Sequence, residues 1–249
     1  MTSPSLVTIA VPSFNQGEFL DCALESIFHQ DVPVEVFVAD GGSTDTSLEV
    51  IGKWEGKLAG WRSHPDSGQS AAINEAISKG NAPYVCWLNS DDWLLPGALE
   101  KLVRALESNP NAGMAYSRVR DYFQERDQFR PGWVRSFSEW WFAQYCFISQ
   151  PGTLVRREAW ELLGGLNEEL HMAMDYDLWW RLYRTCGQPV FVDDYVAVNR
   201  VHGATKTKTQ RRKHYIEAMA VVRKYYGRVP LKWWLAQPYA VWYRSLIGR

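Results

Sequence analysis

Short apolar strands and helices alternate through the first hundred residues, and this alternation restricts the possible folds more than any other feature. Apolar, β-branched runs at residues 7–12, 34–40 and 84–89 are each followed by a stretch whose apolar residues recur at helical spacing. A short segment at 61–64 and the run at 113–119 are two further candidate strands. Such alternation predicts an α/β fold with a Rossmann-like, mostly parallel central sheet flanked by helices.

The second half of the chain is less regular. Residues 125–150 are aromatic and loop-like, and the sequences PVFVDD and VAVNRV further on predict a pair of strands. Apolar residues recur at helical spacing over 157–165, 175–187 and 210–226. Because no repeat or linker interrupts the chain, we expect one domain over 1–205 and a C-terminal helical appendage over 206–249, which is basic and rich in Trp.

Polar side chains stand where the expected strands end. They follow successive strands along the chain: Asn15, Asp40, Asp66 and Asp91. In open α/β sheets, ligands bind in the crevice at the carboxyl ends of the strands. The four residues therefore predict a single cleft at this edge of the sheet.

The sequence NSDD places two carboxylates side by side after an apolar strand. Asp91 and Asp92 repel each other, and burying either one without a partner is unfavourable. A divalent cation would offset this charge, because hard cations take carboxylate oxygens as ligands and keep positions open for phosphate oxygens. The alternative is a turn in which these side chains cap the following helix. This stretch alone does not separate the two interpretations.

Charge and cysteine content exclude several classes of function. The formal net charge is −1, so the whole chain does not attract nucleic acid, although KTKTQRRKH is locally basic. The four cysteines are widely spaced without a CxxC pair, which indicates reduced thiols in a cytosolic protein. The first residues lack the pattern of a signal peptide, and no stretch of about 18 apolar residues predicts a membrane span. We therefore expect a cytoplasmic protein.

Several motifs occur in an order that resembles glycosyltransferase family 2, whose members are inverting nucleotide-sugar enzymes with the GT-A fold. The motifs are VPSFNQGEFLDCALESIFHQ, VADGGSTDTSLEVI, HPDSGQSAAINEAISKG, LNSDDWLLPGAL and MDYDLWWRL. Each lies at an expected strand end or helix start, and the resemblance extends over about residues 5–205. It implies a GT-A fold, a nucleotide-sugar donor and a divalent metal.

The resemblance implies a donor site along the ends of the first four strands. Asp40 is the expected contact to the nucleotide base, because a carboxylate accepts an N–H group from the edge of uracil or thymine. Capping of the next helix is the alternative role for Asp40. Gly41 and Gly42 allow the backbone to approach the ligand closely. The remaining donor residues implied by the resemblance are Pro12, Ser13, Asn15, Asp66, Gln69, Asn89 and Ser90.

Two carboxylates carry the chemistry that the resemblance implies. Asp91 matches the last Asp of the family's Asp-x-Asp motif and is the expected ligand of Mn²⁺ or Mg²⁺, which bridges the diphosphate. Asn89 replaces the first Asp of that motif, which removes a charge and weakens metal affinity. Asp175 matches the catalytic base that takes the proton of the acceptor hydroxyl. Met174 replaces the Glu that precedes this base in the family, and Asp177 is the competing candidate.

Downstream, NRVHGATKT resembles the family's Arg-x-His segment. His202 is expected to bind the metal or the diphosphate, with a structural role as the alternative. Arg200 and Lys206 are expected to neutralise charge on the leaving group. Gln150 matches a position of sugar contacts in relatives. Four tryptophans are expected either to stack on acceptor sugars or to pack in the core: Trp140, Trp141, Trp179 and Trp180. Packing in the core is favoured for Trp179.

Together these residues predict a metal-dependent inverting glycosyltransferase. It would move a sugar from a UDP- or dTDP-sugar to a hydroxyl of a glycan or a lipid-linked oligosaccharide, in bacterial surface polysaccharide synthesis. The alternative is a non-catalytic nucleotide- or glycan-binding module on the same fold, which Asn89 and Met174 favour. The basic and Trp-rich appendage over 206–249 predicts either contact with the anionic inner face of the plasma membrane or packing on the domain.

Overall fold

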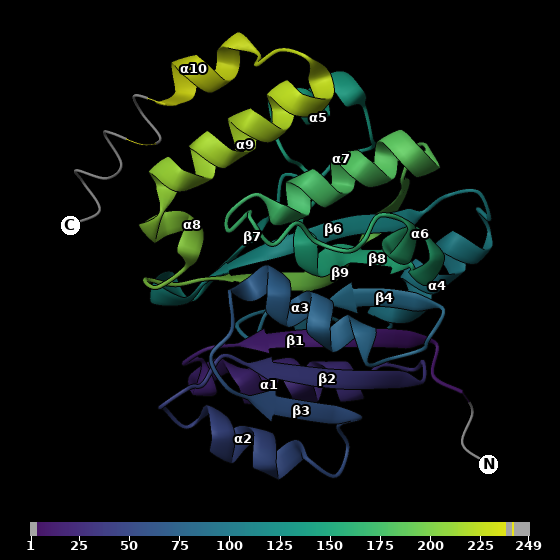
Figure 1. Cartoon of the computed structure of the whole chain (residues 1–249), viewed down its shortest axis with the longest axis vertical. Coiled ribbons are helices and arrows are strands. Elements are labelled where there is room, and N and C mark those ends of the chain that lie inside the picture. The colour runs from purple at the N-terminus through teal and green to yellow at the C-terminus, as the bar shows by residue number, and fades with distance from the viewer. Residues whose placement is uncertain (1–3, 238–240, 242–249) are drawn as a thin grey trace.

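The structure is a computed structural model that describes residues 4–237 and residue 241. Within these residues, a nine-stranded sheet runs through the molecule in the order β3-β2-β1-β4-β8-β6-β9-β5, with β7 paired to β6 outside this path (Figure 1). The strands are β1 (Val7–Ser13), β2 (Val34–Asp40), β3 (Gly60–Ser63), β4 (Tyr84–Trp87), β5 (Trp93–Leu94), β6 (Met114–Phe123), β7 (Gln128–Pro131), β8 (Thr153–Arg156) and β9 (Val190–Val201).

Most strands of the sheet run in the same direction. β3, β2, β1 and β4 pair in parallel, and β6 pairs in parallel with β9. β8 is inserted antiparallel between β4 and β6, so β4 and β6 also share a direction. Only β5, β7 and β8 run the opposite way among the described strands. The prediction of a mostly parallel sheet is therefore confirmed, and the carboxyl ends of the long strands meet at one edge.

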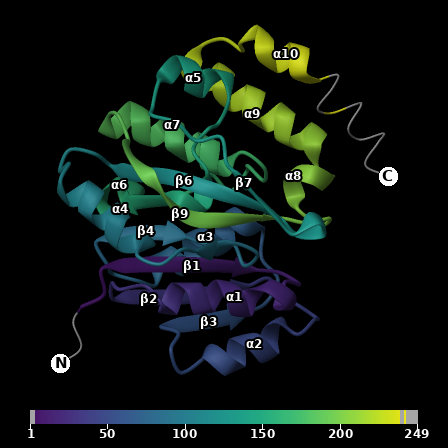
Figure 2. The ribbon, with the colours of Figure 1, turned by 180° about the vertical axis from the view of Figure 1, so that it is seen from behind.

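Helices cover both faces of the sheet, as the two opposite views show (Figures 1 and 2). One face carries α1 (Gly17–Phe28), α2 (Ser47–Trp54) and α4 (Ala98–Glu107). The other face carries α3 (Gln69–Ser78), α7 (Met174–Cys186) and α9 (Arg211–Tyr226). The shorter helices are α5 (Glu139–Gln144), α6 (Arg157–Leu162), α8 (Lys206–Thr209) and α10 (Leu231–Gln237), with 3₁₀ turns at Gln124–Arg126 and Gln150–Gly152.

Side-chain alternation along β1 explains how one strand serves two cores. Val7, Ile9 and Val11 point into the core shared with α1, α2 and α4, and Ala10 points into the core shared with α3 and α7. Every residue of β1 is buried, as expected for a strand covered by helices on both faces. β1 is therefore a rigid support for the loop that follows it, from residue 14 to residue 16.

The structure differs from the sequence-based prediction in three places. The expected pair of strands is one continuous strand, β9, in which Asp193 and Asp194 project outward and form ion pairs with Arg118 and Lys101. A register irregularity against β6 accommodates these residues. The loop-like segment 125–150 contains β7 and α5, and a two-residue strand, β5, follows Asp92.

The described part of the appendage packs on the domain. Tyr225 on α9 donates a hydrogen bond of 2.8 Å to Asp177 on α7, and the indole N–H of Trp233 donates 2.7 Å to the carbonyl of Ala143. The domain boundary at residue 205 remains a prediction, and the tail at 238–240 and 242–249 lies outside the described residues. In the described ranges, no helix combines the length and apolar character needed to cross a bilayer.

Candidate active site

A cleft of about 710 Å³ opens at the carboxyl ends of β1, β2 and β4. The N-termini of α3 and α7 and the segment around α8 close its sides. It brings together eleven of the side chains predicted from the sequence: Pro12, Ser13, Asp66, Gln69, Asn89, Ser90, Asp91, Gln150, Asp175, Arg200 and Lys206. Three further candidates do not line the cleft: Asp40 accepts the N–H of Gly42 in its wall, His202 lies against Asp91, and Asn15 stands between the lining residues Phe14 and Gln16.

Asp40 lies beneath the cleft wall and is completely buried. Its carboxylate accepts hydrogen bonds from the N–H groups of Gly42 and Ser43, at 3.0 and 2.8 Å, and from the hydroxyls of Ser43 and Ser63, at 2.5 and 2.6 Å. These bonds fix the turn that carries Gly41 and Gly42 into the cleft. A direct contact between Asp40 and a nucleotide base remains a prediction.

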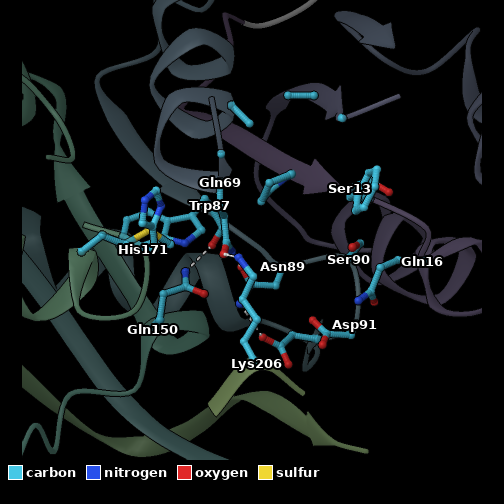
Figure 3. A pocket seen from close by; sticks show the side chains of 18 of the residues that line it. Ser13, Gln16, Gln69, Trp87, Asn89, Ser90, Asp91, Gln150, His171 and Lys206 are labelled. Carbon is cyan, nitrogen blue, oxygen red and sulfur yellow. Dashed lines mark hydrogen bonds between the residues drawn. The ribbon is translucent and has the colours of Figure 1, made fainter. Parts of the chain in front are cut away.

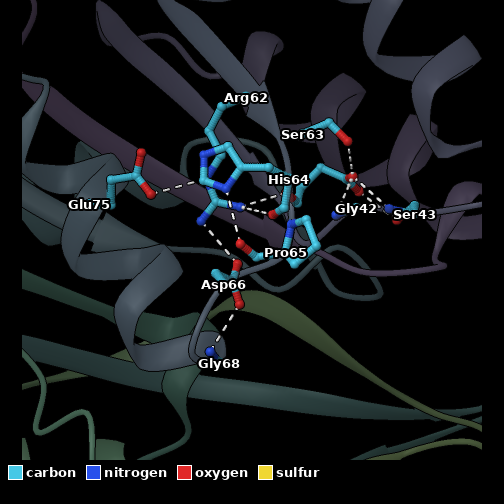
Figure 4. A network of polar contacts seen from close by, with 10 residues as sticks. Gly42, Ser43, Arg62, Ser63, His64, Pro65, Asp66, Gly68 and Glu75 are labelled. Carbon is cyan, nitrogen blue, oxygen red and sulfur yellow. Dashed lines mark hydrogen bonds and ion pairs between the residues drawn. The ribbon is translucent and has the colours of Figure 1, made fainter.

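Arg62 organises the neighbouring wall, although nothing in the sequence singled it out. Its guanidinium donates to the carboxylates of Asp66 and Glu75, at 2.9 and 3.0 Å, and to the carbonyl of Asp40 at 2.5 Å (Figure 4). Asp66 also accepts the N–H of Gly68 at 2.9 Å, at the start of α3. The ends of β2 and β3 and the N-terminus of α3 are thus joined by one cation.

The side chains of the NSDD turn do not cap the following helix, because the N-cap residue of α4 is Gly97 and no side chain caps it, and the cation interpretation remains a prediction. Asp92 is 2 % exposed and accepts hydrogen bonds from the side-chain amide of Asn89, at 3.2 Å, and from the N–H of Arg200, at 2.9 Å. Burial, together with the charge of Asp91, raises the pKa of Asp92 well above its ordinary value. Asp92 therefore holds the turn together, while Asp91 lines the cleft.

Asp91 is paired with His202 across the cleft wall. Its Oδ2 atom lies 3.1 Å from Nε2 of His202, whose ring packs against Phe19 with a centroid distance of 4.8 Å. Arg200 donates 2.9 Å to the carbonyl of Asp91, and its guanidinium lies 4.9 Å from the ring of Phe19 and 4.6 Å from that of Trp93. The aromatic rings fix the cation beside the acidic turn.

A chain of side-chain hydrogen bonds crosses the cleft from α8 to the NSDD turn. The ammonium of Lys206 donates 2.8 Å to the amide oxygen of Gln69, whose NH₂ group donates 2.8 Å to Asn89. Figure 3 shows these three residues between Trp87 and Gln150 on one side and Ser13 and Gln16 on the other. Burial lowers the pKa of Lys206, against the charge of Asp91, which raises it. Lys206 thus stands within the electrostatic field of the turn.

The structure separates the two candidates for the base. Asp177 is 1 % exposed, forms an ion pair of 2.7 Å with Arg181 and accepts the hydroxyl of Tyr225. Asp175 lines the cleft, and in the described part of the chain only the N–H of Tyr176 donates to its carboxylate, at 2.7 Å. Burial raises the pKa of Asp175, partly offset by hydrogen bonding to the N–H of Tyr176 and by the imidazole of His214. Asp175 is the carboxylate available for chemistry.

Four polar side-chain atoms that line the cleft are buried without a hydrogen-bond partner among the described residues. They are Oγ of Ser13, Oε1 of Gln16, Nε1 of Trp87 and Oε1 of Gln150. Buried polar groups are rarely left unpaired, so such atoms in a cleft indicate a polar ligand. The amide NH₂ of Gln150 is fixed on the carbonyl of Trp87 at 2.7 Å, which leaves its oxygen free.

Sequence reasoning missed several residues of this cleft, notably Phe14, Trp87, His171 and Met172. Phe14 is 61 % exposed and lies against Gly41, where a Cβ atom would meet its ring at 3.2 Å. The signal available in the sequence was an aromatic residue between the predicted Ser13 and Asn15. Among the tryptophans, Trp179 and Trp180 are core residues, whereas Trp140 is about half exposed.

Among the described residues, no group of three or more His, Cys, Asp or Glu side chains is arranged to hold a metal ion. Asp91 and His202 nevertheless place an oxygen and a nitrogen 3.1 Å apart at the cleft wall. The charge of Asp91 is one cause of the raised pKa of the adjoining Asp92, and a cation bound at Asp91 would offset this repulsion. Two protein ligands suit a divalent ion that takes its remaining ligands from phosphate and water.

A sheet with a cleft at its carboxyl edge, lined by an acidic turn and a half-buried carboxylate, is the arrangement in which α/β proteins bind nucleotides. Comparison with known families agrees, because the model of glycosyl transferase family 2 matches residues 8–163. The chain belongs to this family. The family and the glycosyltransferase class predicted from the motifs are therefore confirmed.

Named relatives and solved structures agree with this assignment. The chain is 28% identical over 221 residues to chondroitin synthase of Pasteurella multocida and 30% identical over 182 residues to hyaluronan synthase of the same species. These matches cover 85% and 71% of the chain but only 22% and 18% of the relatives, so the chain spans about a fifth of their length.

The structural neighbours confirm the GT-A fold. S. aureus TarS 1–349, in complex with UDP-GlcNAc, gives a TM-score of 0.70 at 16% identity, over 88% of this chain and 65% of TarS 1–349. Mannosyltransferase PcManGT from Pyrobaculum calidifontis, in complex with GDP-Man and Mn²⁺, also gives 0.70 at 20% identity, over 99% of this chain and 74% of its own. At these identities the likeness establishes the fold.

Proposed function

We propose that the chain is a metal-dependent inverting glycosyltransferase, which moves a sugar from a nucleotide diphosphate sugar to a hydroxyl of a glycan or lipid-linked oligosaccharide. One observation carries the proposal: a single cleft is lined both by Asp91, which is paired with His202 in the wall, and by a half-buried carboxylate, Asp175, to which no other side chain donates among the described residues. The first suits a diphosphate with its cation, and the second suits a general base.

The nucleotide is expected at the wall formed by the ends of β1, β2 and β3. Phe14, Pro12 and Pro65 offer apolar contact to a planar base, and Gly41 and Gly42 allow close approach of the backbone. Asp66 supplies a carboxylate that accepts an N–H group, which favours uracil or thymine and hence a UDP- or dTDP-sugar. TarS is known in complex with UDP and UDP-GlcNAc, and PcManGT in complex with GDP-Man, so donors differ within this fold.

The diphosphate is expected beside the NSDD turn. Asp91 and His202 would hold Mn²⁺ or Mg²⁺, which when bound offsets the charge of the phosphates. Arg200, fixed by aromatic rings, and Lys206, at the opposite wall, add positive charge where the leaving group departs. PcManGT, known in complex with GDP-Man and Mn²⁺, supports the use of a divalent metal.

Asp175 is expected to act on the acceptor. Its carboxylate takes the proton of an acceptor hydroxyl while that oxygen forms a bond to the anomeric carbon of the donor sugar. The bond from this carbon to the phosphate oxygen breaks on the opposite face, and the nucleoside diphosphate leaves with the electron pair. The anomeric configuration is inverted, and the proton remains on Asp175 until solvent removes it.

A donor-turnover experiment tests the proposal. The chain is incubated with UDP-, dTDP- and GDP-sugars and Mn²⁺, with and without oligosaccharide acceptors, and the release of nucleoside diphosphate is measured. We expect metal-dependent release with at least one donor and, by NMR of the product, an inverted anomeric centre. Tight donor binding without release under any of these conditions would instead favour a non-catalytic binding module. This alternative is favoured by Asn89 and Met174, because each replaces an acidic residue of the family pattern.

Location at the cytoplasmic face of the plasma membrane is part of the proposal. The basic residues of α8 and the start of α9 would approach anionic headgroups, and exposed apolar residues of α10, Leu231, Trp234 and Leu235, would enter the interface. Sedimentation with anionic vesicles measures this contact. Equal recovery with neutral vesicles would argue against the electrostatic part of the proposal.

A further inference from the structure

A carboxylate on α9 holds the loop that leads into α7. The Oε2 atom of Glu217 accepts hydrogen bonds from three successive main-chain N–H groups, those of His171 at 3.1 Å, Met172 at 2.7 Å and Ala173 at 3.1 Å. Asp175 follows two residues later, in the first turn of α7. One side chain thus fixes the backbone directly before the proposed base.

The local chain does not provide this support itself. Ala173 is the N-cap residue of α7, and its side chain has no oxygen with which to accept an N–H group. The first N–H groups of a helix lack partners within the helix, and negative charge near them is favourable. Glu217 supplies both an acceptor and a charge from another helix, through hydrogen bonds to an ionised group, which are stronger than neutral ones.

The loop held by Glu217 is also a wall of the cleft. His171, Met172 and Met174 line it together with Asp175. On the opposite side, the hydroxyl of Ser70 on α3 lies 3.1 Å from the carbonyl of Leu170 and 2.8 Å from the sulfur of Met174. The loop is therefore held by hydrogen bonds from two sides, from α9 and from α3, which borders the proposed donor site.

We propose that Glu217 is a positioning residue for Asp175. This inference rests on the proposed function, in which Asp175 is the base. By holding residues 171–173, Glu217 sets where the carboxylate stands relative to an acceptor hydroxyl and keeps bulk water away from it. Helix α9, which lies in the segment that the sequence presented as an appendage, thereby contributes to the catalytic geometry.

The surroundings of Asp175 give this role a measurable consequence. The titratable groups that face it are the Cys146 thiol from the loop after α5, the His214 imidazole from α9 and the Tyr176 phenol from α7 itself. Burial is the main cause of its raised pKa, so loosening the loop admits water and moves the pKa back toward that of an ordinary Asp.

Hydrogen exchange of the unliganded chain tests the clamp without activity. In Glu217→Ala, the amides of residues 171–173 are expected to exchange at least about tenfold faster than in the wild type, because each loses a hydrogen bond to a charged acceptor. Glu161→Gln, which alters an exposed ion pair with Arg157 on α6, is the control and should leave these amides protected. Unchanged exchange at 171–173 in Glu217→Ala would overturn the proposal.

Kinetics test the consequence for Asp175. Glu217→Ala is expected to lower kcat by about 10- to 100-fold, because small displacements of a catalytic group have effects of this size. The KM for the donor should stay within about threefold, since donor contacts lie elsewhere in the cleft. Glu217→Gln keeps an acceptor oxygen without the charge, so its kcat should lie between those of the wild type and Glu217→Ala. Glu217→Gln is measured in place of Glu217→Ala if the latter does not fold.

The pH profile separates positioning from a general loss of structure. The acid limb of kcat is expected to move to lower pH in Glu217→Ala and Glu217→Gln, because Asp175 becomes better solvated. Wild-type kcat with an unmoved limb in both variants would overturn the proposal. The variant Asp175→Asn is measured in parallel: if it retains full transfer, the assignment of the base fails, whereas a dead Asp175→Asn beside normal Glu217 variants refutes only the positioning role.

Discussion

The Nε2 atom of His202 lies 3.1 Å from the Oδ2 atom of Asp91, although 111 positions separate the two residues in the chain. β4 ends at Trp87, four residues before Asp91, and β9 ends at Val201, directly before His202, so the segments that follow two strands bring the pair together. The backbone N–H of Arg200 fixes the same turn through Asp92. The proposed cation site is therefore built by tertiary structure and not by a local motif alone.

The pairing of Asp91 with His202 leads to a prediction for the loss of the Asp91 carboxylate. In Asp91→Asn, the affinity for a nucleotide-sugar donor with Mn²⁺ is expected to fall at least about tenfold, because the remaining ligands bind the cation more weakly. Isothermal titration with and without EDTA measures this loss. Asp194→Asn, which changes a surface ion pair with Lys101, is the matched control. An EDTA-sensitive affinity equal to that of the wild type would place the metal elsewhere.

Substitution of the proposed base should separate catalysis from binding. Asp175→Asn is expected to lower kcat by at least about 10²-fold, which is the lower range of general base assistance. Donor affinity should remain unchanged, because the carboxylate acts on the acceptor. Single-turnover transfer and donor titration on the same preparation distinguish the two effects. Transfer at the wild-type rate would move the base away from this helix.

Asp177 is expected to behave in the opposite way. It is buried in a network with Arg181 and Tyr225, and Lys224 lies 3.6 Å away. Removing one partner of a buried ion pair costs about 3–5 kcal/mol of unfolding free energy, because the other charge is left uncompensated. Asp177→Ala should therefore unfold at lower urea concentration, while its folded fraction keeps kcat. A large loss of kcat at unchanged stability would contradict this assignment.

The raised pKa of Asp175 predicts two pH effects. The base works only when deprotonated, so kcat should fall with decreasing pH through a pKa above that of an ordinary Asp. Because the pKa is higher in the folded than in the unfolded chain, stability is lost as pH rises from the unfolded value through the folded value. Asp175→Asn removes this loss. The melting temperature of Asp175→Asn, relative to that of the wild type, should therefore be higher at neutral pH than at pH about 3. The same difference between variant and wild type at both pH values would contradict a raised pKa of Asp175.

Phe14 predicts the orientation of the nucleotide. Stacking of a base on an aromatic ring contributes about 1–3 kcal/mol, so Phe14→Ala should weaken donor binding roughly 5- to 100-fold. Phe14→Tyr keeps the ring face and should retain affinity. Trp140→Ala, on α5 outside the cleft lining, provides a control for the loss of an exposed aromatic residue. Equal donor affinity in Phe14→Ala would exclude the ring as the base contact.

Local patterns predicted the half of the fold that contains the strand–helix alternation. The runs at β1, β2 and β4 and the helical faces of α1, α3 and α4 carry signals strong enough that tertiary contacts only reinforce them. β9 was predicted as two strands, PVFVDD and VAVNRV, and the first ends in Asp193 and Asp194, a residue type that is disfavoured in strands. Their outward ion pairs and the irregular register against β6 override that preference.

The site also contains residues that could be predicted from the sequence and residues that could not. Residues at strand ends and in motifs, such as Asp91, Gln69 and Asp175, could be placed in one cleft from the sequence. Arg62 and Glu217 could not, because each acts through main-chain groups that are brought near only by folding. Hydrogen bonds to the backbone of a distant segment leave no pattern in the sequence.

The link from Glu217 to residues 171–173 also orders events during protein synthesis. A chain emerging from the ribosome exposes β1 to β4, and hence the wall proposed to bind the nucleotide base, well before α9 has been made. The loop before Asp175 gains its last hydrogen bonds only after Glu217 has left the exit tunnel. A nascent chain therefore forms the strand ends proposed to bind the nucleotide base first and fixes the loop before Asp175 last.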